Sequence, residues 1–201
     1  MKVIDFYFDF SSPYGYFMSE KIGATAHKYG RTVHWHPVLL FAVLRSVGLP
    51  PPFEHPIKLE YITKDFARSA KQSGVKYGLP PTFPASTQHA ARAFYQLREK
   101  APDCAIPFAQ SVLRKFFCEG LDISSLELIC QTVCSQTDAL GDLMGVSDLL
   151  KTQAAKSVLQ NAIAQAVDKK VFGSPFVIID GEPFFGFDRL LQIEQKLAST
   201  V

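Results

Sequence analysis

Residues 5–17, DFYFDFSSPYGYF, decide how the amino-terminal part of this chain is expected to fold. Residues 3–10 are rich in aromatic and β-branched side chains, which is typical of a buried strand. Pro13 suits the first position of a helix, and Ser12 before it is a favourable N-cap residue. The sequence therefore predicts a strand that runs directly into a helix, with Ser12 at the junction.

The segment after Pro13 continues the helix pattern and then returns to a strand. Apolar side chains recur at three- or four-residue spacing as far as Tyr29, and Gly30 is a favourable residue just past a helix end. Residues 32–39, TVHWHPVL, have the pattern of a second strand. Strand, helix and strand at these lengths predict a βαβ unit with parallel strands.

The middle of the chain has helical patterns that are broken by two proline-rich joints, GLPPPFEHP at 48–56 and GLPPTFPAS at 78–86. The predicted helices cover residues 56–73, 88–100, 107–119, 124–135 and 147–170, and the last of these is either one helix or two. The pattern contains no internal repeat. We therefore expect residues 41–170 to form a helical insertion.

The last part of the chain returns to strands. Residues 175–187, PFVIIDGEPFFGF, form two short apolar runs around Asp180-Gly181, which is a strong signal for a two-residue hairpin. Residues 188–197 predict a closing helix, whose apolar positions Leu190, Leu191, Ile193 and Leu197 would cover a sheet. The element order βαβ, helical block, ββα predicts an α/β fold with a four-stranded sheet interrupted by the insertion.

Composition and charge exclude several classes of protein. The chain has 201 residues, of which 47% are hydrophobic and 20% charged, as in an ordinary globular protein. A formal charge of +2 gives no basis for nucleic-acid binding, and no apolar run reaches the ~18 residues that span a membrane. Four cysteines without a signal-peptide pattern favour reduced thiols and a cytoplasmic location.

Ser12 has two interpretations. Its hydroxyl lies beside the free N–H groups and the positive end of a helix dipole, an environment that stabilises a thiolate or a carboxylate. The carboxyl end of a strand in a βαβ unit is also where α/β sheets bind ligands. Alternatively, Ser12 only caps the helix, and the spacing alone leaves both interpretations open.

Two further motifs lie near the carboxyl terminus. In FGSPF, residues 172–176, a cis Ser174-Pro175 bond would turn the Ser174 backbone outward to pair with an extended peptide. A trans proline that begins a strand is the alternative, since only ~5–6% of X–Pro bonds are cis. In FFGFDR, residues 184–189, Asp188 either caps a helix or binds a ligand ammonium group, with Gly186 allowing a close approach.

No metal site or hydrolase motif is predicted. His34 and His36 point to the same face of one strand, but two histidines without further ligands make a weak zinc site. The chain contains no Ser-His-Asp motif, no glycine-rich phosphate loop and no Cys-x-x-Cys.

In their order and position, these motifs resemble the DsbA-like branch of the thioredoxin superfamily. Within that branch they are similar to 2-hydroxychromene-2-carboxylate isomerases and kappa-class glutathione transferases. The resemblance rests on DFYFDFSSPYGY at 5–16, PVLL at 37–40, PIKLEYITKDFAR at 56–68, FP at 83–84 and VFGSPFVIIDGEPFFGFDR at 171–189. It implies a thioredoxin-like domain from residues 1–40 and 171–201, and a helical insertion domain at 41–170 whose last helix packs on the sheet.

The resemblance also implies a glutathione site. Ser12 stands where redox relatives have a reactive cysteine, and would hydrogen-bond the glutathione sulfur. Pro13 and Tyr14 would shape that wall, and the Ser174 backbone, before a Pro175 that is cis in the family, would pair with the cysteinyl part. Four residues would hold the γ-glutamyl end, with the last of them binding its ammonium group: Phe185, Gly186, Phe187 and Asp188.

The expected substrate pocket departs from the family pattern. Beyond PVLL the family has a glycine, a lysine and an asparagine, whereas this chain has Phe41, Arg45 and Leu49 nearby. Ser86 stands where an asparagine is common, and Ser174 where a valine is. Arg45 and Lys58 are candidates for binding a substrate carboxylate, with surface charge as the alternative. The substrate candidates are Arg45, Leu49, Lys58 and Ser86.

The leading hypothesis is a glutathione-dependent isomerase of aromatic-compound catabolism. It would act by reversible addition of the thiolate to an unsaturated 2-oxo acid, rotation about the new single bond, and elimination of glutathione. The alternatives are a kappa-like glutathione transferase and, from a different class, a non-catalytic thioredoxin-fold module that binds peptides. Family resemblance further implies a homodimer.

Overall fold

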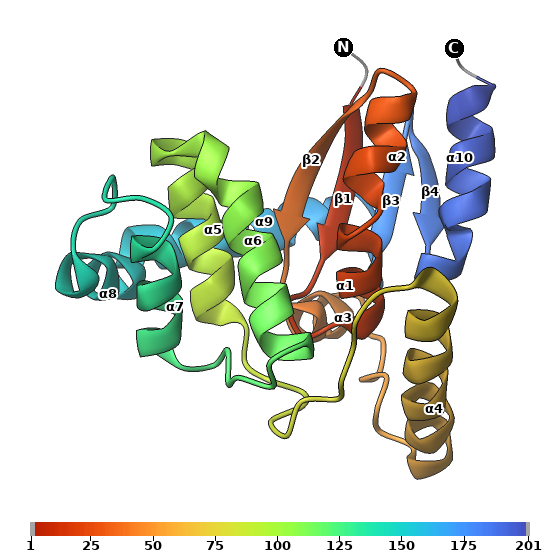
Figure 1. Ribbon diagram of the computed structural model, residues 1–201, viewed down its shortest axis with the longest axis horizontal. Coiled ribbons are helices and arrows are strands. Elements are labelled where there is room, and N and C mark those ends of the chain that lie inside the picture. The colour runs from red at the N-terminus through yellow and green to blue at the C-terminus, as the bar shows by residue number, and fades with distance from the viewer. Residues whose placement is uncertain (1–2, 200–201) are drawn as a thin grey trace.

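The structure is a computed structural model that describes residues 3–199, so the outermost residues of the two predicted terminal segments lie outside it. Its core is a four-stranded sheet with the order β2-β1-β3-β4 (Figure 1). The strands are β1 (Val3–Phe8), β2 (Thr32–Pro37), β3 (Phe176–Ile179) and β4 (Glu182–Phe185). β1 pairs parallel with β2 and antiparallel with β3, which confirms the predicted βαβ unit and the α/β thioredoxin-like sheet.

Helices α3 to α9 lie between β2 and β3 in the chain, whereas α1 and α2 connect β1 to β2 and α10 follows β4. In Figure 1, α1, α2 and α10 lie on the near face of the sheet, and α9 passes behind it. The helices are α1 (Pro13–Ser19), α2 (Ile22–Lys28), α3 (Leu40–Ser46), α4 (Pro56–Ser73), α5 (Gln88–Lys100), α6 (Pro102–Phe117), α7 (Leu126–Cys134), α8 (Leu143–Lys151), α9 (Gln153–Asp168) and α10 (Leu190–Ala198). The division into two domains stays a prediction.

The two faces of β1 bury different parts of the core, because successive side chains of a strand point to opposite sides. Ile4, Phe6 and Phe8 lie in the main core, together with residues of α1, α2, α6 and α10. Tyr7 lies on the other face in a smaller cluster with Val43 of α3. Ala166 of α9 belongs to the same cluster.

The hairpin after β3 has the backbone that its sequence predicts. Asp180 and Gly181 have φ angles of 51° and 85°, as a two-residue hairpin turn requires. The Asp180 carboxylate accepts two hydrogen bonds from the Arg31 guanidinium, at 3.0 and 2.9 Å. This planar pair ties the turn to the residue just before β2.

The predicted helix over residues 13–29 is wrong in its length, because the structure has two helices there, α1 and α2. At the end of α1 the Ser19 hydroxyl donates to the Tyr16 carbonyl at 2.7 Å, and the Glu20 N–H donates to the same carbonyl at 3.3 Å. Local side-chain bonds of this kind compete with the regular helical pattern. The chain bends at this point, and Gly30 follows α2 with the predicted positive φ of 64°.

Two other helix boundaries differ from the prediction. Helix α6 begins at Pro102, and Pro107, the predicted start, lies inside it. The region 147–170 contains two helices, as one of the two alternatives predicted, but the first of them, α8, already begins at Leu143. The Thr152 hydroxyl caps α9.

Helix α3 is absent from the prediction. Its N-cap residue, Leu39, makes no capping bond, and the Leu40 N–H donates instead to the carboxylate of Asp9 at 2.7 Å. A cap supplied by a residue 31 positions away leaves no local signature in the sequence.

The closing helix covers the sheet with fewer residues than predicted. It begins at Leu190, after a 3₁₀ turn over Phe187–Arg189. Ile193 and Leu197 are fully buried, whereas Leu191 is 65% exposed and does not cover the sheet.

Within the described residues, no helix is long and apolar enough to cross a membrane.

Removal of a core aromatic side chain should show how much of the stability comes from the packing of α6 on α1. Phe117 is fully buried and stacks on Tyr16 with 5.2 Å between ring centroids. Phe117→Ala should lower the free energy of unfolding by ~3–5 kcal/mol, because it leaves a cavity in the core. Chemical denaturation measures this change. Leu191→Ala, at an exposed position, is the control and should change stability by less than about 0.5 kcal/mol.

Candidate functional site

Ser12 occupies the carboxyl end of β1 and the amino end of α1, and its hydroxyl has two partners. The Gly15 N–H donates to Ser12 Oγ at 3.1 Å, which makes Ser12 the N-cap residue of α1 as predicted. The hydroxyl in turn donates to the carbonyl oxygen of Ser174 at 2.9 Å. Ser12 is 9% exposed, so this hydroxyl lies at the inner end of the site, beside the positive end of the α1 dipole.

Ser174 contacts the strand–helix junction with both its backbone and its side chain. Its Oγ accepts a hydrogen bond from the Asp9 N–H at 2.9 Å, while its carbonyl accepts from Ser12. The Ser174-Pro175 bond is cis, as the family resemblance implies. The segment before β3 is therefore held against the end of β1 by two hydrogen bonds.

Gly15 allows this close approach. A Cβ atom on Gly15 would lie 2.8 Å from Ser174 Oγ, closer than real Cβ contacts, and 3.2 Å from Ser12 Cβ, which is tight. The first turn of α1 can therefore pack against Ser174 only because residue 15 has no side chain.

The carboxylate of Asp9 joins the strand–helix junction to two distant segments, at Leu40 and Thr87, and the sequence interpretation assigned it no role. Its Oδ1 accepts from the Ser11 N–H at 2.8 Å and from the Thr87 hydroxyl at 3.0 Å, and its Oδ2 accepts from the Leu40 N–H at 2.7 Å. Asp9 is 7% exposed, and among residues 3–199 no lysine or arginine forms a salt bridge with it. Burial raises the pKa of Asp9, and the three hydrogen bonds offset part of that increase.

The side chain of Ser11 was interpreted from the sequence as filling at the end of the strand. In the structure its Oγ accepts from the Ala85 N–H at 3.0 Å. Ala85 follows the Phe83-Pro84 bond, which is also cis. The segment before α5 is thereby attached to the strand–helix junction, and an isolated serine in the sequence carries no signal for such a contact.

A cavity of about 800 Å³ opens in front of these groups. Nine of the predicted site residues line it: Ser12, Pro13, Tyr14, Arg45, Leu49, Lys58, Ser86, Ser174 and Phe185. The structure thus brings five of the nine expected glutathione-binding residues and all four substrate candidates to one cavity. Arg45 and Lys58 are the two basic residues among those that line it.

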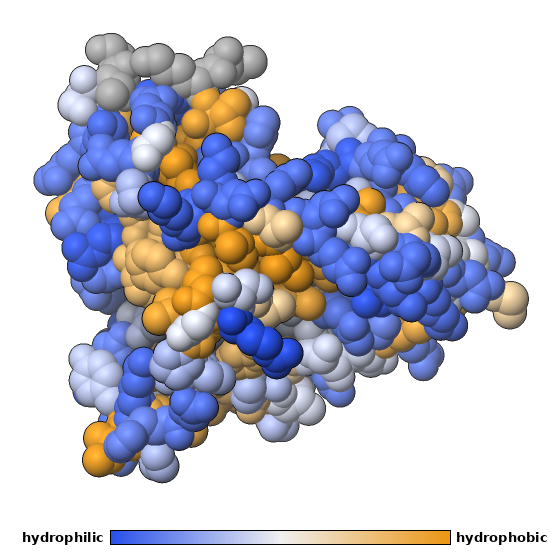
Figure 2. All heavy atoms as spheres, turned by 180° about the vertical axis from the view of Figure 1, so that it is seen from behind, coloured by the Kyte–Doolittle hydropathy of each residue, from blue (hydrophilic) through white to orange (hydrophobic). Residues whose placement is uncertain are grey.

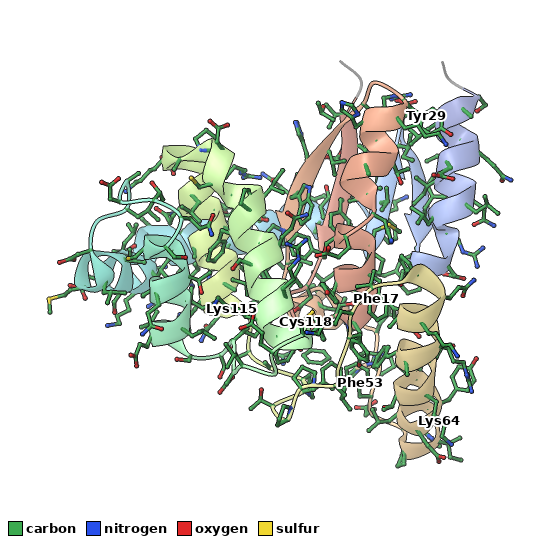
Figure 3. The ribbon with its side chains drawn as sticks, in the orientation of Figure 1. Phe17, Tyr29, Phe53, Lys64, Lys115 and Cys118 are labelled. Atoms are coloured by element: carbon green, nitrogen blue, oxygen red, sulfur yellow. The ribbon has the colours of Figure 1, made fainter. Side chains whose placement is uncertain are left out.

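Several aromatic side chains line the cavity, and three of them were not singled out in the sequence: Phe53, Phe66 and Phe172. Phe53, from the loop between α3 and α4, lies with its ring 6.4 Å from Phe41 and 5.3 Å from Phe83 (Figure 3). Phe172 lies 4.9 Å from Phe185 at the edge near β4. Figure 2 views the molecule from the side opposite to Figure 1 and shows apolar side chains gathered over the middle of that face.

Four of the predicted glutathione-binding residues lie outside the cavity lining: Pro175, Gly186, Phe187 and Asp188. The Gly186 N–H donates to the Pro175 carbonyl at 3.1 Å, and Gly186 has a φ of 106° that favours glycine. Asp188 makes no capping bond, so the helix-cap interpretation is wrong. Its carboxylate is exposed and contacts the neighbouring Arg189.

Tyr14 connects α1 to α4 at the side of the cavity. Its hydroxyl donates to the Asp65 carboxylate. Burial and this hydrogen bond raise the pKa of Tyr14, so it stays a neutral phenol at neutral pH.

The two histidines of β2 lie away from the cavity. His36 Nε2 is 2.8 Å from Asp5 Oδ1, and burial lowers the pKa of His36 despite this partner. In the described part of the chain, no group of three His, Cys, Asp or Glu side chains is placed to hold a metal ion.

Substitutions at two glycines test the close contact between the amino end of α1 and Ser174. Gly15→Ala should weaken the Ser12–Ser174 contact and lower the free energy of unfolding, because the new Cβ would overlap Ser174 Oγ. Gly23→Ala in α2 is the matched control: its Cβ meets nothing within 4 Å, and it should stabilise the protein by ~0.5–1 kcal/mol through helix propensity. Thermal or chemical denaturation of both variants measures the difference. Equal stabilisation by both would contradict the close approach.

The raised pKa of Asp9 predicts a pH dependence of stability. Because the folded state binds this proton more tightly than the unfolded state, the free energy of unfolding should fall as pH rises from about 3.9, the ordinary aspartate pKa, through the raised pKa of Asp9. Asp9→Asn removes this contribution, so its stability should fall less steeply over that window. Denaturation of both proteins at several pH values measures the two slopes, and identical slopes would contradict a raised pKa.

Comparison with known proteins supports the fold and identifies the family. A 2-hydroxychromene-2-carboxylate isomerase of Pseudomonas putida is 28% identical over 202 residues, which cover 97% of this chain and 94% of that protein. Glutathione S-transferase kappa 2 of Caenorhabditis elegans is 26% identical, covering 98% of this chain and 92% of its own. The solved structure of a 2-hydroxychromene-2-carboxylate isomerase superposes with a TM-score of 0.84 at 25% identity, over 98% of this chain and 95% of the other. The DSBA-like thioredoxin domain matches residues 3–198, and the chain belongs to that family.

Proposed function

We propose that this protein is a glutathione-dependent isomerase that acts on an unsaturated 2-oxo acid. The observation that carries the proposal is the position of the Ser12 hydroxyl, at the amino terminus of α1 and at the wall of an apolar cavity that two basic residues also line. The relatives named as isomerases and as kappa glutathione transferases support an enzyme.

Ser12 would activate the thiol of glutathione. A free thiol has a pKa of about 8.5, and a hydrogen-bond donor together with a helix amino terminus lowers that value. The chain has no cysteine at this point of the site, so the glutathione sulfur itself would be the nucleophile. Pro13 and Tyr14, which follow Ser12, also line the cavity.

The remaining parts of glutathione would lie against the segment before β3 and the segment at the end of β4. The cysteinyl backbone would pair with Ser174, whose N–H has no hydrogen-bond partner among residues 3–199. Phe185, Gly186 and Phe187 would hold the γ-glutamyl part. Asp188 would bind the ammonium group by exchanging its present contact with Arg189.

The cavity beyond the sulfur would bind the electrophile. Phe41, Leu49 and Phe53 provide an apolar wall, and Arg45 and Lys58 provide positive charge for a carboxylate. Ser86, just before α5, is a further polar group of the lining. Addition of the thiolate converts the double bond of the substrate to a single bond, rotation follows, and elimination regenerates glutathione with no net redox change.

A kappa-like glutathione transferase is the second candidate, because such proteins are also among the relatives. A transferase would release a covalent glutathione conjugate, whereas an isomerase returns free glutathione, and mass spectrometry of the products separates the two. A non-catalytic peptide-binding module would bind glutathione or a peptide and consume nothing. We also propose a cytoplasmic location, because the four cysteines are free thiols, and a homodimer, on the basis of family resemblance.

The proposal is tested by glutathione binding and by the state of the bound thiol. Calorimetry should detect binding at millimolar glutathione, and ultraviolet absorbance should show a thiolate near neutral pH. Ser12→Ala should raise the pKa of the bound thiol, because the thiolate loses a hydrogen-bond donor. Ser19→Ala is the matched control, since it removes a buried hydroxyl from the same helix that bonds the Tyr16 carbonyl outside the cavity.

No binding at millimolar concentrations would contradict every enzymatic proposal here. Turnover of unsaturated 2-oxo acids in the presence of glutathione, followed by the yield of isomer and of recovered glutathione, then identifies the reaction.

A further inference from the structure

In the ligand-free site, the Ser12 hydroxyl already donates its one proton to a hydrogen bond. Ser12 Oγ lies 2.9 Å from the carbonyl oxygen of Ser174, and a carbonyl can only accept, so the hydroxyl is the donor. The Gly15 N–H occupies the acceptor side of the same hydroxyl at 3.1 Å. A serine hydroxyl has one proton, so Ser12 cannot donate to a sulfur atom and to Ser174 at the same time.

If the Ser12 hydroxyl turned to donate to a sulfur atom, the Ser174 carbonyl would be left without a hydrogen-bond donor. Ser174 is 7% exposed, and among residues 3–199 the Ser12 hydroxyl is the donor that reaches its carbonyl. An unpaired buried carbonyl is costly. Ser174 cannot easily turn its carbonyl elsewhere, because its Oγ is held by the Asp9 N–H at 2.9 Å and lies against the backbone of Gly15. The site therefore favours a ligand that supplies a replacement donor.

We propose that an amide N–H of the bound thiol replaces Ser12 as the donor to the Ser174 carbonyl, and so releases the Ser12 hydroxyl to donate to the sulfur. The inference rests on the proposed function, and deepens it by specifying the thiols that the site activates. They carry an amide N–H on the carbon next to the CH₂SH group, as a cysteinyl residue in a peptide does. A thiol without that N–H binds to a site whose hydroxyl remains turned toward Ser174.

The site thus discriminates thiols by the protonation state it gives them. Thiols with and without the amide N–H present the same sulfur to the same helix amino terminus, so the dipole of α1 acts on both. The difference between them is one hydrogen bond to the thiolate, which depends on whether the Ser12 hydroxyl is free. Ser174 is on this basis a positioning residue, whose carbonyl sets the direction of the Ser12 hydroxyl.

The test compares glutathione with an isostere in which a methylene group replaces the N–H between the γ-glutamyl and cysteinyl parts. The pKa of each thiol is measured free and bound to the unmodified protein, from the pH dependence of thiolate absorbance. Binding should lower the thiol pKa of glutathione by about one to two units more than that of the isostere, as expected for one hydrogen bond to a charged group.

Two variants locate the effect. In Ser12→Ala the difference between the two ligands should vanish, because the released hydroxyl is absent. In the control Ser19→Ala the difference should remain. The comparison of ligands on the unmodified protein stands by itself if the Ser12 variant does not fold.

The outcomes separate this inference from the proposed function. Glutathione binding with equal pKa shifts for the two ligands would overturn the inference and leave the proposed function intact. A difference that persists in Ser12→Ala would also overturn it, because the amide would then act through another group. No binding of either thiol would overturn the proposed function, and this inference with it.

Discussion

The site depends on one buried carboxylate. Asp9 accepts hydrogen bonds from the Ser11 N–H, the Leu40 N–H and the Thr87 hydroxyl, which lie on three different segments of the chain. A carboxylate with no cationic partner is costly to bury, and the three donors satisfy it in place of solvent. All four residues line the cavity, so a buried group whose charged form is disfavoured by burial also holds the cavity wall together.

Sequence patterns correctly predicted the helices and turns that are formed by interactions between residues close together in the chain. The bounds of α4 and α5 agree with their apolar spacing, and the hairpin at Asp180-Gly181 agrees with its turn residues. Ser12 was identified as an N-cap because its partner, the Gly15 N–H, lies three residues away. In each case the interaction that forms the element is contained within a few residues of sequence.

The features that the sequence did not predict arise from distant partners. Helix α3 is capped by Asp9, 31 residues earlier, and Ser11 bonds to Ala85, 74 residues later. The aromatic wall around Phe53 forms because loops that are separate in the chain meet at the cavity. The sequence also predicted a cap role or a ligand role for Asp188, and only the structure excluded the first.

The sheet order has a consequence for the synthesis of the chain. β1 is an inner strand between β2 and β3, yet β3 begins at Phe176, and the Ser12–Ser174 bond joins residues 162 positions apart. At ~5–20 residues per second, the edge of β1 that faces β3 waits roughly 10–30 s on the ribosome for its partner. An open, apolar edge strand invites pairing with other chains during that time. The polypeptide therefore completes its sheet and its candidate site in the same late step, when the last few dozen residues emerge.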